Sequence, residues 1–239
     1  SWDEMMKAPH DDAYIEVMKH YGRAGRAAKL LSNEIRMRGY FSKDKPGPMT
    51  EDVLMIPAAI EAGLGELGKH GSIIHRNFGS NFRLSLVLTD MLLTPDRPDV
   101  FGADTFCENC QVCTKACPPR AISPEKQMVR GEIKWYVNFD ACIQYFVDNQ
   151  TCGICLAVCP WSRPGIADKL TVKMARKEKK LHPNLETYSL GPLCDQLEVS
   201  SEPFRQDNAH AAVYDAQFTY FLYRHFILLA FDKRLVSPA

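Results

Sequence analysis

The sequence lacks three features that would point to a membrane or a nucleic acid as its main partner. Its apolar run near the C-terminus, Phe218 to Phe231, is interrupted by Arg224 and His225 and is too short to cross a bilayer. Charge is balanced, with 29 basic and 29 acidic residues, so no nucleic acid or anionic surface is expected. No signal peptide or twin-arginine segment opens the chain, and no transmembrane segment is expected. The reduced thiols of its cysteines imply a cytoplasmic or anaerobic setting.

The sequence also lacks an initiator methionine, because it begins Ser-Trp-Asp-Glu, and we expect an upstream region to be missing. Four glycines, Gly63, Gly65, Gly68 and Gly71, fall close together, yet the spacing of a phosphate loop or of a dinucleotide fold is absent. Glycine permits close approach of the backbone, here to a partner element or to a flat cofactor. The sequence leaves both possibilities open.

Cysteine, by contrast, is abundant and concentrated. The chain has nine cysteines, and eight of them lie between residues 107 and 160. The first run has the spacing Cys-x2-Cys-x2-Cys-x3-Cys-Pro, and the second ends in Cys-x2-Cys-x3-Cys-Pro after a separate Cys142. The first spacing is typical of bacterial iron–sulfur proteins, in which three thiolates bind one cluster and the fourth binds its neighbour. The sequence therefore predicts two 4Fe–4S clusters.

Crosswise ligation follows from this spacing, because a short loop reaches three iron corners and the fourth thiolate must come from elsewhere. One cluster is predicted on Cys107, Cys110, Cys113 and Cys159, and the other on Cys117, Cys142, Cys152 and Cys155. A single cluster or a zinc site is the alternative, although structural zinc usually uses two separate Cys-x2-Cys pairs. Disulfides would need a secretory context.

Hydrophobic periodicity predicts a mixed α/β (α+β) fold. Tyr21 lies on the apolar stripe of the first helix, where a plain core role is the default, and Arg83 begins a strand, where a solvated edge charge is the default. The expected elements are a helix over 12–38, with Val17 and Met18 on its apolar stripe, and helices over 58–62 and 166–180. A strand is expected over 82–90, a polar loop over 42–50 and a linker around Pro95 and Pro98.

Two further expectations concern the surroundings of the cysteines. The aromatic residues of the 130–146 insert are expected to shield the clusters from water, and four cations are expected to offset cluster charge. The aromatics are Trp135, Tyr136, Phe139, Tyr145 and Phe146, and the cations are Lys115, Arg120, Lys134 and Arg163. The ninth cysteine, Cys194, is expected to be an ordinary buried thiol.

The combined order of motifs resembles the corrinoid-dependent reductive dehalogenases, with the epoxyqueuosine reductases as relatives. The resemblance covers roughly residues 12–165. It rests on Tyr21 in its helix, Gly39-Tyr40, Ile56-Pro57-Ala58-Ala59, the stretch Ala62-Gly63-Leu64-Gly65-Glu66-Leu67-Gly68-Lys69, Arg83, Thr89-Asp90 and the cysteine runs. Epoxyqueuosine reductases usually carry a tryptophan where Leu64 stands.

The resemblance implies a nitroreductase-like domain that binds a corrinoid (cobalamin), with a ferredoxin-like module packed over it. Electrons from a donor protein or reductase would pass through the clusters to cobalt, which would reduce an organohalide. Tyr21 would supply the proton with the assistance of Arg83. The glycine segment, through Gly63, Gly65, Gly68 and Lys69, would contact the corrinoid.

Three regions are predicted on this basis. Residues 1–98 form a partial corrinoid-binding and catalytic domain, 99–165 the two-cluster module, and 166–239 a C-terminal helical region without assigned chemistry. The function predicted is reductive dehalogenation. The alternatives are a tRNA-modifying enzyme like epoxyqueuosine reductase, and an electron-transfer subunit with no active site.

Overall fold

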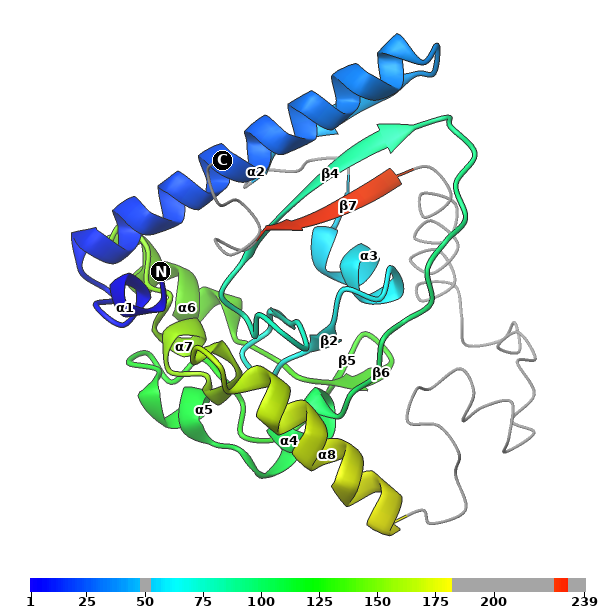
Figure 1. Cartoon of the computed structure of the whole chain (residues 1–239). Helices are drawn as coiled ribbons and strands as arrows, with labels where there is room; N and C mark the ends of the chain where they lie inside the picture. Colours follow the sequence, from blue (N-terminus) through cyan, green and yellow to red (C-terminus); the bar gives the residue numbers. More distant parts are fainter. Residues whose placement is uncertain (48–52, 182–225, 232–239) are drawn as a thin grey trace.

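A computed structural model describes residues 1–47, 53–181 and 226–231 of the protein (Figure 1). It has the mixed helix and strand composition that the sequence predicts. In chain order the elements are α1 (Trp2–Met5), α2 (Asp11–Met37), β1 (Ser42–Lys45), α3 (Met55–Glu61), β2 (Glu66–Leu67), β3 (Ile73–Ile74), β4 (Arg83–Thr89), α4 (Ala103–Asn109), α5 (Val112–Ala116), β5 (Gln127–Val129), β6 (Glu132–Lys134), α6 (Phe139–Asp148), α7 (Ile154–Ala157), the 3-10 helix η1 (Pro160–Ser162), α8 (Ala167–Leu181) and β7 (Phe226–Phe231).

The upper half of the molecule is an antiparallel sheet in the order β1-β4-β7, with the long helix α2 running along it (Figure 1). The central strand β4 pairs with β1 from Ser42 opposite Thr89, and with β7 from Arg83 opposite Phe231. Both helix α2 and strand β4 begin and end within one residue of the predicted bounds. The predictions for these two elements are confirmed.

Alternate residues of β4 face opposite layers, as expected for a strand buried on both faces. Leu86 packs with Val53 and Ala58 on the α3 side. Its neighbour Val87 packs with Ala28 and Ile35 of α2. By this alternation Arg83 faces the same side as Val87, so it is directed towards α2.

Two expectations for this half were wrong. The segment from Ser42 to Lys45 was expected to be loop, but it forms β1, because the backbone groups of β4 offer it a partner and its charged side chains suit an edge strand. Met18 was expected on the buried stripe of α2, yet it is 46% exposed, because the stripe drifts round the helix and the neighbouring Val17 takes the buried position.

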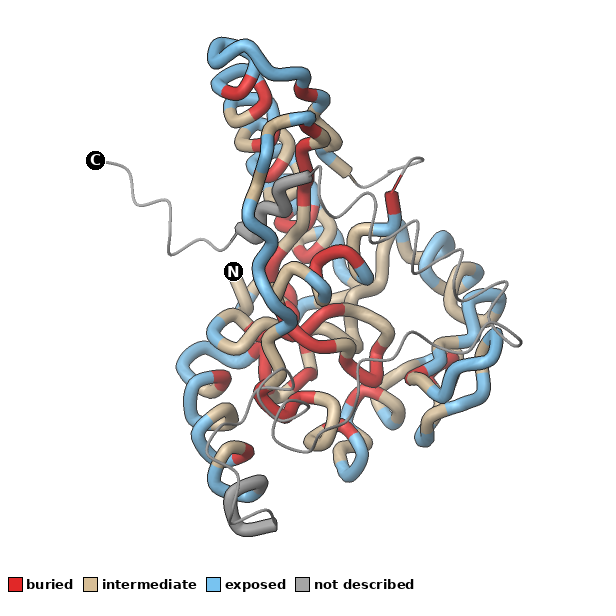
Figure 2. The backbone as a smooth tube through the Cα atoms, turned by 90° about the vertical axis from the view of Figure 1, so that its right-hand side faces the viewer, coloured by how far each residue is buried: buried red, intermediate tan, exposed pale blue. Residues whose placement is uncertain are grey.

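The lower half joins the β2–β3 hairpin to the cysteine-bearing elements α4 to α7 and to α8. A single core, in which Trp161 is only 1% exposed, crosses from one to the other, and buried residues gather in this region (Figure 2). The rings of Phe101 and Phe106 stand edge-on to Trp161, with centroids 5.4 and 5.6 Å away. Ile74 of β3 belongs to the same core, so residues before and after position 98 pack together.

Helix α8 matches the helix predicted after Pro164, and the stretch around Pro95 and Pro98 contains no helix or strand, as expected of a linker. In the part of the chain that the structure describes, no helix combines the length and apolar character needed to cross a bilayer. Cys194 and most of the predicted C-terminal region lie outside the described residues.

A pair of glycine substitutions tests how closely the two halves are joined. Gly79 has φ +61°, and a Cβ there would stand 2.0 Å from the carbonyl oxygen of Trp161. Gly131 has φ +88° with no atom within 4 Å of that position. Gly131→Ala should therefore lower the free energy of unfolding by about 1–2 kcal/mol, the strain of a left-handed backbone. Gly79→Ala should lower it by about 1–3 kcal/mol more because of overpacking.

Urea unfolding of both variants measures the difference. Equal losses of stability in Gly79→Ala and Gly131→Ala would contradict the close approach of the Gly79 turn to the cysteine-bearing half.

Candidate functional site

The eight cysteines fall into two groups of free thiols. In the first group, Cys107 lies on α4, Cys113 on α5 and Cys159 just before η1, with Cys110 at the end of α4. The pKa of Cys107 and of Cys159 is raised to about 12, mainly by burial and in smaller part by the charges of Cys110 and Cys113. These four thiols are therefore close enough to oppose one another's ionisation.

The second group joins Cys117, at the end of α5, to Cys142 of α6, and to Cys152 and Cys155 near α7. The pKa of Cys155 is raised to about 12, mainly by burial and in smaller part by the neighbouring Cys152. Burial and Cys117 also raise the pKa of Cys142. The grouping thus crosses the sequence: Cys117 lies with the later cysteines, and Cys159 with the earlier ones.

The chemistry of these donors fits iron–sulfur clusters. Thiols crowded in a partly dry interior ionise only when a cation compensates them, and only the thiolate binds metal. Among the described residues, no three His, Cys, Asp or Glu side chains close on one point as the ligands of a single metal ion do. A four-iron cluster needs four thiolates at separate corners of a cube, and each group supplies four.

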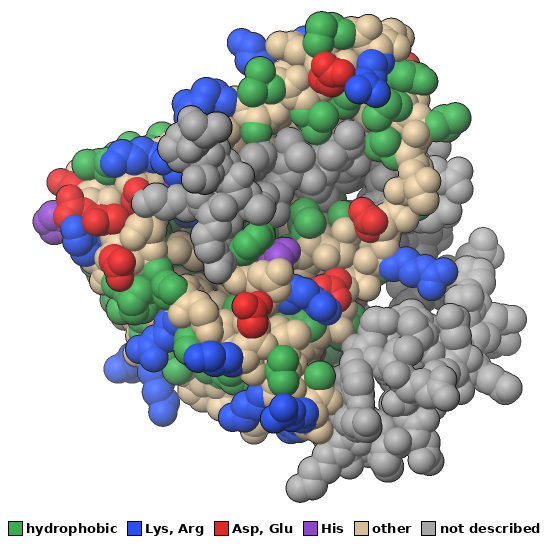
Figure 3. All heavy atoms as spheres, in the orientation of Figure 1, with side chains coloured by type: hydrophobic (Ala, Val, Ile, Leu, Met, Phe, Trp, Pro, Cys, Tyr) green, Lys and Arg blue, Asp and Glu red, His purple; other side chains and the backbone are tan. Residues whose placement is uncertain are grey.

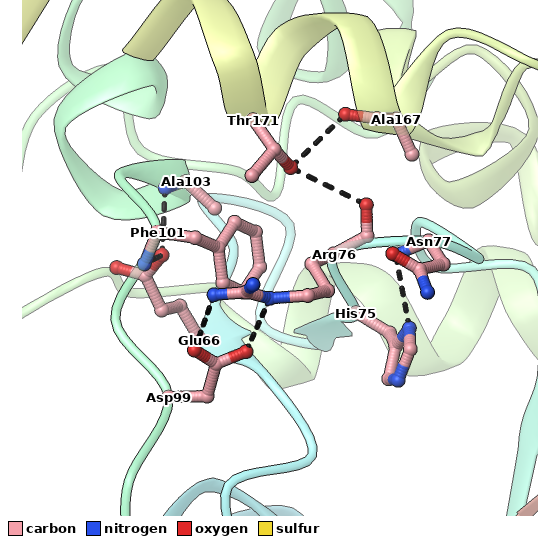
Figure 4. Close-up of polar contacts among 9 residues, drawn as sticks. All are labelled: Glu66, His75, Arg76, Asn77, Asp99, Phe101, Ala103, Ala167 and Thr171. Carbon is pink, nitrogen blue, oxygen red and sulfur yellow. Dashed lines mark hydrogen bonds and ion pairs between the residues drawn. The ribbon is translucent and has the colours of Figure 1, made fainter. Parts of the chain in front are cut away.

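A buried carboxylate attaches the glycine segment to the first cysteine helix (Figure 4). Glu66 accepts hydrogen bonds from the backbone N–H of Phe101 at 3.0 Å and of Ala103 at 2.7 Å, at the start of α4. Burial raises the pKa of Glu66, and these N–H groups act in the opposite direction by stabilising the carboxylate. The carboxylate takes up backbone donors that the first turn of a helix leaves unpaired.

A second attachment lies beside it in the same view. The Arg76 guanidinium donates two hydrogen bonds to the Asp99 carboxylate, and the one from Nε measures 2.6 Å. The guanidinium also lies 5.5 Å from the centre of the Phe101 ring. The carbonyl oxygen of Arg76 accepts a bond from Thr171 of α8. Sequence reasoning missed this pair, because nothing in the spacing of Arg76 and Asp99 marks them as partners.

The glycines of residues 63–71 lie mainly against other atoms of the protein. A Cβ on Gly63 would stand 2.4 Å from the carbonyl oxygen of Arg97, and one on Gly65 would stand 2.1 Å from that of Ile74. One on Gly68 would stand 2.6 Å from the ring of His70. Of the two possibilities left open by the sequence, the close approach to a partner element accounts for these glycines. Their expected contact with a corrinoid stays a prediction.

Lys69, expected with them as a corrinoid contact, points into the cysteine-bearing half. It is 1% exposed, and its Nζ donates to the carbonyl oxygen of Pro124 at 2.8 Å. Trp135, over which this ammonium lies at 4.7 Å, packs in one core with Cys107 and Cys159. Burial raises the pKa of Cys113, and the charge of Lys69 acts in the opposite direction. The structure therefore places Lys69 beside the first cysteine group.

Tyr21 and Arg83 meet between α2 and β4, as the facing of β4 requires. The Arg83 guanidinium lies 5.2 Å from the centre of the Tyr21 ring. Its Nη1 donates to the carbonyl oxygen of Phe82 at 3.1 Å, whereas its buried Nε has no partner among the described residues. Burial lowers the pKa of Arg83, and Tyr21 acts in the opposite direction. Arg83 is thus a confined cation, and the default of a solvated edge charge is wrong.

Two residues beside this pair escaped sequence reasoning. His20 and Asn81 line both a small cavity with Arg83 and a larger one, of about 170 Å³, that extends to Arg163 and Gly165. Burial lowers the pKa of His20, while a 3.2 Å bond to Glu16 acts against it. Their only sequence signal is proximity, since His20 precedes Tyr21 and Asn81 stands two residues before Arg83.

The unpartnered Arg83 nitrogen and the polar cavity wall suit a ligand. The cavity is nevertheless smaller than the roughly 300–1,000 Å³ of sites that enclose a drug-sized molecule. The described residues could therefore contact part of a corrin ring and do not enclose one.

The expected aromatic shield is mostly absent. Trp135 is buried, with its indole N–H donating to Asp104 at 2.6 Å, but Phe139 is 66% exposed and Tyr136 and Phe146 are exposed as well. The reason is that α6 has no buried residue, so its aromatic side chains face outwards. Lys and Arg side chains gather on the lower part of the face drawn in Figure 3, where the cysteine-bearing helices lie. The cation found among the thiols is Lys69, which was not among the four expected.

Known proteins resemble the chain in sequence. A family profile described as a 4Fe-4S dicluster domain matches residues 106–162. A tetrachloroethene reductive dehalogenase of Desulfitobacterium hafniense is 34% identical over 176 residues, which cover 68% of this chain and 31% of that protein. One from Sulfurospirillum multivorans is 33% identical over 173 residues, covering 68% and 34%. An epoxyqueuosine reductase of Synechocystis sp. is 30% identical over 147 residues, covering 54% and 46%.

Solved structures agree. A catabolic reductive dehalogenase, NpRdhA, in complex with 3-bromo-4-hydroxybenzoic acid, superposes with a TM-score of 0.65 at 29% identity, covering 73% of this chain and 26% of that one. A second structure, reported as suggesting a mechanism for B12-dependent dehalogenation, has a TM-score of 0.65 at 27% identity, covering 76% and 29%. The chain spans about a third of the length of the dehalogenases that it matches in sequence. Over the residues that align, the chain belongs to the reductive dehalogenase family.

Proposed function

We propose that this protein is an iron–sulfur reductase that removes halogen from an organohalide. The observation that carries the proposal is the attachment of two four-thiol groups, through Glu66 and Arg76, to a domain in which Arg83 faces Tyr21. One part can deliver electrons, and the other can handle a proton. The reaction converts a carbon–halogen bond into a carbon–hydrogen bond by taking up two electrons and one proton, and halide leaves.

The two groups of thiols each hold one 4Fe–4S cluster. The first cluster is bound by Cys107, Cys110, Cys113 and Cys159, and the second by Cys117, Cys142, Cys152 and Cys155. Because each run contributes its last cysteine to the other cluster, the two clusters stay close, which suits electrons passing from one to the next. An electron-donor protein or reductase supplies them.

Relatives of the family point to a corrinoid, which when bound supplies a reduced cobalt centre able to break a carbon–halogen bond. The residues of this chain would position the substrate and manage the proton. Tyr21 donates its phenolic proton to the carbon from which halide has left. Arg83, held at 5.2 Å from the ring, stabilises the phenolate that remains. His20 and Asn81 line the adjoining cavity and can orient a polar group.

Two alternative functions share parts of this site. The match to epoxyqueuosine reductase favours a related reductase acting on tRNA, against which stand the balanced charge and Leu64 in place of the usual tryptophan. An electron-transfer subunit would need no acid at Tyr21. Anaerobic reconstitution with iron, sulfide and corrinoid separates them: a cobalt spectrum excludes the subunit, and release of halide from tetrachloroethene or 3-bromo-4-hydroxybenzoic acid selects the dehalogenase.

Cysteine replacement tests the crosswise ligation. The anaerobically purified protein should contain about eight irons per chain, the count for two cubanes. Cys117→Ala should remove the cluster of Cys142, Cys152 and Cys155 and leave the one beside it in sequence, so iron should fall to about four. Cys194→Ala is the control and should keep about eight. Tightly bound zinc, or loss of the first cluster in Cys117→Ala, would refute the assignment.

Removal of one hydroxyl tests the proton donor. Tyr21→Phe keeps the ring in its place against α2 and Arg83, so clusters and corrinoid should remain bound. Halide release from the reconstituted protein should fall by about two to four orders of magnitude, the usual loss for a general acid. Tyr14→Phe, on the same helix, should have no such effect. Near-normal turnover in Tyr21→Phe would show that the tyrosine only packs.

A further inference from the structure

Lys69 is a buried cation whose charge has no partner among the carboxylates of the described residues. Its Nζ bonds the neutral carbonyl oxygen of Pro124 and lies 4.7 Å from the centre of the Trp135 ring. Two other cations of the lower half are neutralised: Arg76 binds Asp99, and Lys126 binds Asp104 at 2.6 Å. A full charge inside the protein is costly unless something compensates it.

The contacts of Lys69 place its ammonium next to the first cysteine group. The ring of Trp135, over which its ammonium lies, packs in one core with Cys107 and Cys159, and the carbonyl oxygen of Pro124 also accepts a hydrogen bond from Gln111, the residue that follows Cys110. Among the described residues, no cysteine of the second group belongs to that core. The cation therefore acts on one of the two groups.

The position of Lys69 is fixed by the fold. Gly68 precedes it, where a Cβ would stand 2.6 Å from the His70 ring, and the Glu66 carboxylate anchors the same segment to α4. The ring of Trp135 and the carbonyl of Pro124 hold the ammonium in an orientation that a flexible surface lysine would lack. The ammonium therefore keeps a fixed position, and its electrostatic effect on its surroundings is constant.

We infer that Lys69 is the counter-cation of the cluster on Cys107, Cys110, Cys113 and Cys159, and that it makes this cluster the more easily reduced of the two. The inference rests on the two clusters of the proposed function. When the cluster accepts one electron from a reductant, it gains one negative charge, and no bond breaks or forms. A buried ammonium stabilises that added charge strongly, because the surrounding protein screens it weakly. Net charge and hydrogen bonds to sulfur are among the factors that set cluster potentials.

An equilibrium redox titration monitored by electron paramagnetic resonance tests this inference, with dithionite as the one-electron reductant. Lys69→Gln removes the charge while keeping a donor for Pro124. At a fixed ambient potential the reduced-to-oxidised ratio of the first cluster should fall at least tenfold, which for a one-electron couple is about 59 mV. The second cluster should be unchanged. Repeating the titration in the Cys117→Ala background, where the second cluster is removed, assigns the signal.

Two controls separate charge from structure. Lys69→Arg keeps the charge and should restore most of the ratio. Lys134→Gln removes a 41% exposed cation paired with Glu132 and should leave both clusters unchanged. An unchanged first cluster in Lys69→Gln, with iron near eight, would overturn the inference, as would loss of that cluster from both Lys69→Gln and Lys69→Met, which would make the role structural. Absence of clusters from the unsubstituted protein would instead refute the proposed function.

Discussion

The interaction on which the arrangement depends is the buried carboxylate of Glu66 at the start of α4. It accepts backbone N–H groups from Phe101 and Ala103 and so attaches the glycine hairpin to the helix that carries Cys107. The glycines beside it permit this contact, since a Cβ at Gly65 would collide with the backbone at Ile74. The hairpin, the cysteine module and α8 then share one core around Trp161. The glycine hairpin and the cysteine-bearing helices are thereby held in one body.

Burial in that core affects the ionisation of the cysteine thiols. Three of the cysteines, Cys107, Cys113 and Cys159, are buried, and crowding of thiols in a dry interior disfavours their ionisation. Bound iron compensates this, so the clusters and the packing of the lower half are expected to depend on each other. Lys69 adds a positive charge beside the first group, since it lies over Trp135 in the core of Cys107 and Cys159. The two groups, so similar in spacing, therefore lie in electrostatically different surroundings.

The contact between Tyr21 and Arg83 follows from the geometry of a single strand. Side chains of β4 alternate between α3 and α2, so Arg83 shares the face of Val87 and meets Tyr21. Because β4 is paired on both edges, its backbone is fixed and the guanidinium stays confined beside the tyrosine. Arg83, whose Nε has no hydrogen-bond partner among the described residues, lines the small cavity together with His20 and Asn81.

Local patterns in the sequence determined the long helix, the central strand, the grouping of the cysteine runs and the family resemblance, because periodicity and spacing act over short distances. Tertiary structure decided the rest. Ser42–Lys45 is a strand only because β4 lies beside it. Phe139 and Phe146 are exposed because no residue of α6 is buried. The partners of Glu66, Arg76 and Lys69 lie 23 to 55 residues away, and no local signal specifies such pairs. Charge and burial at the site are properties of the packed chain, since each depends on atoms brought together from distant segments.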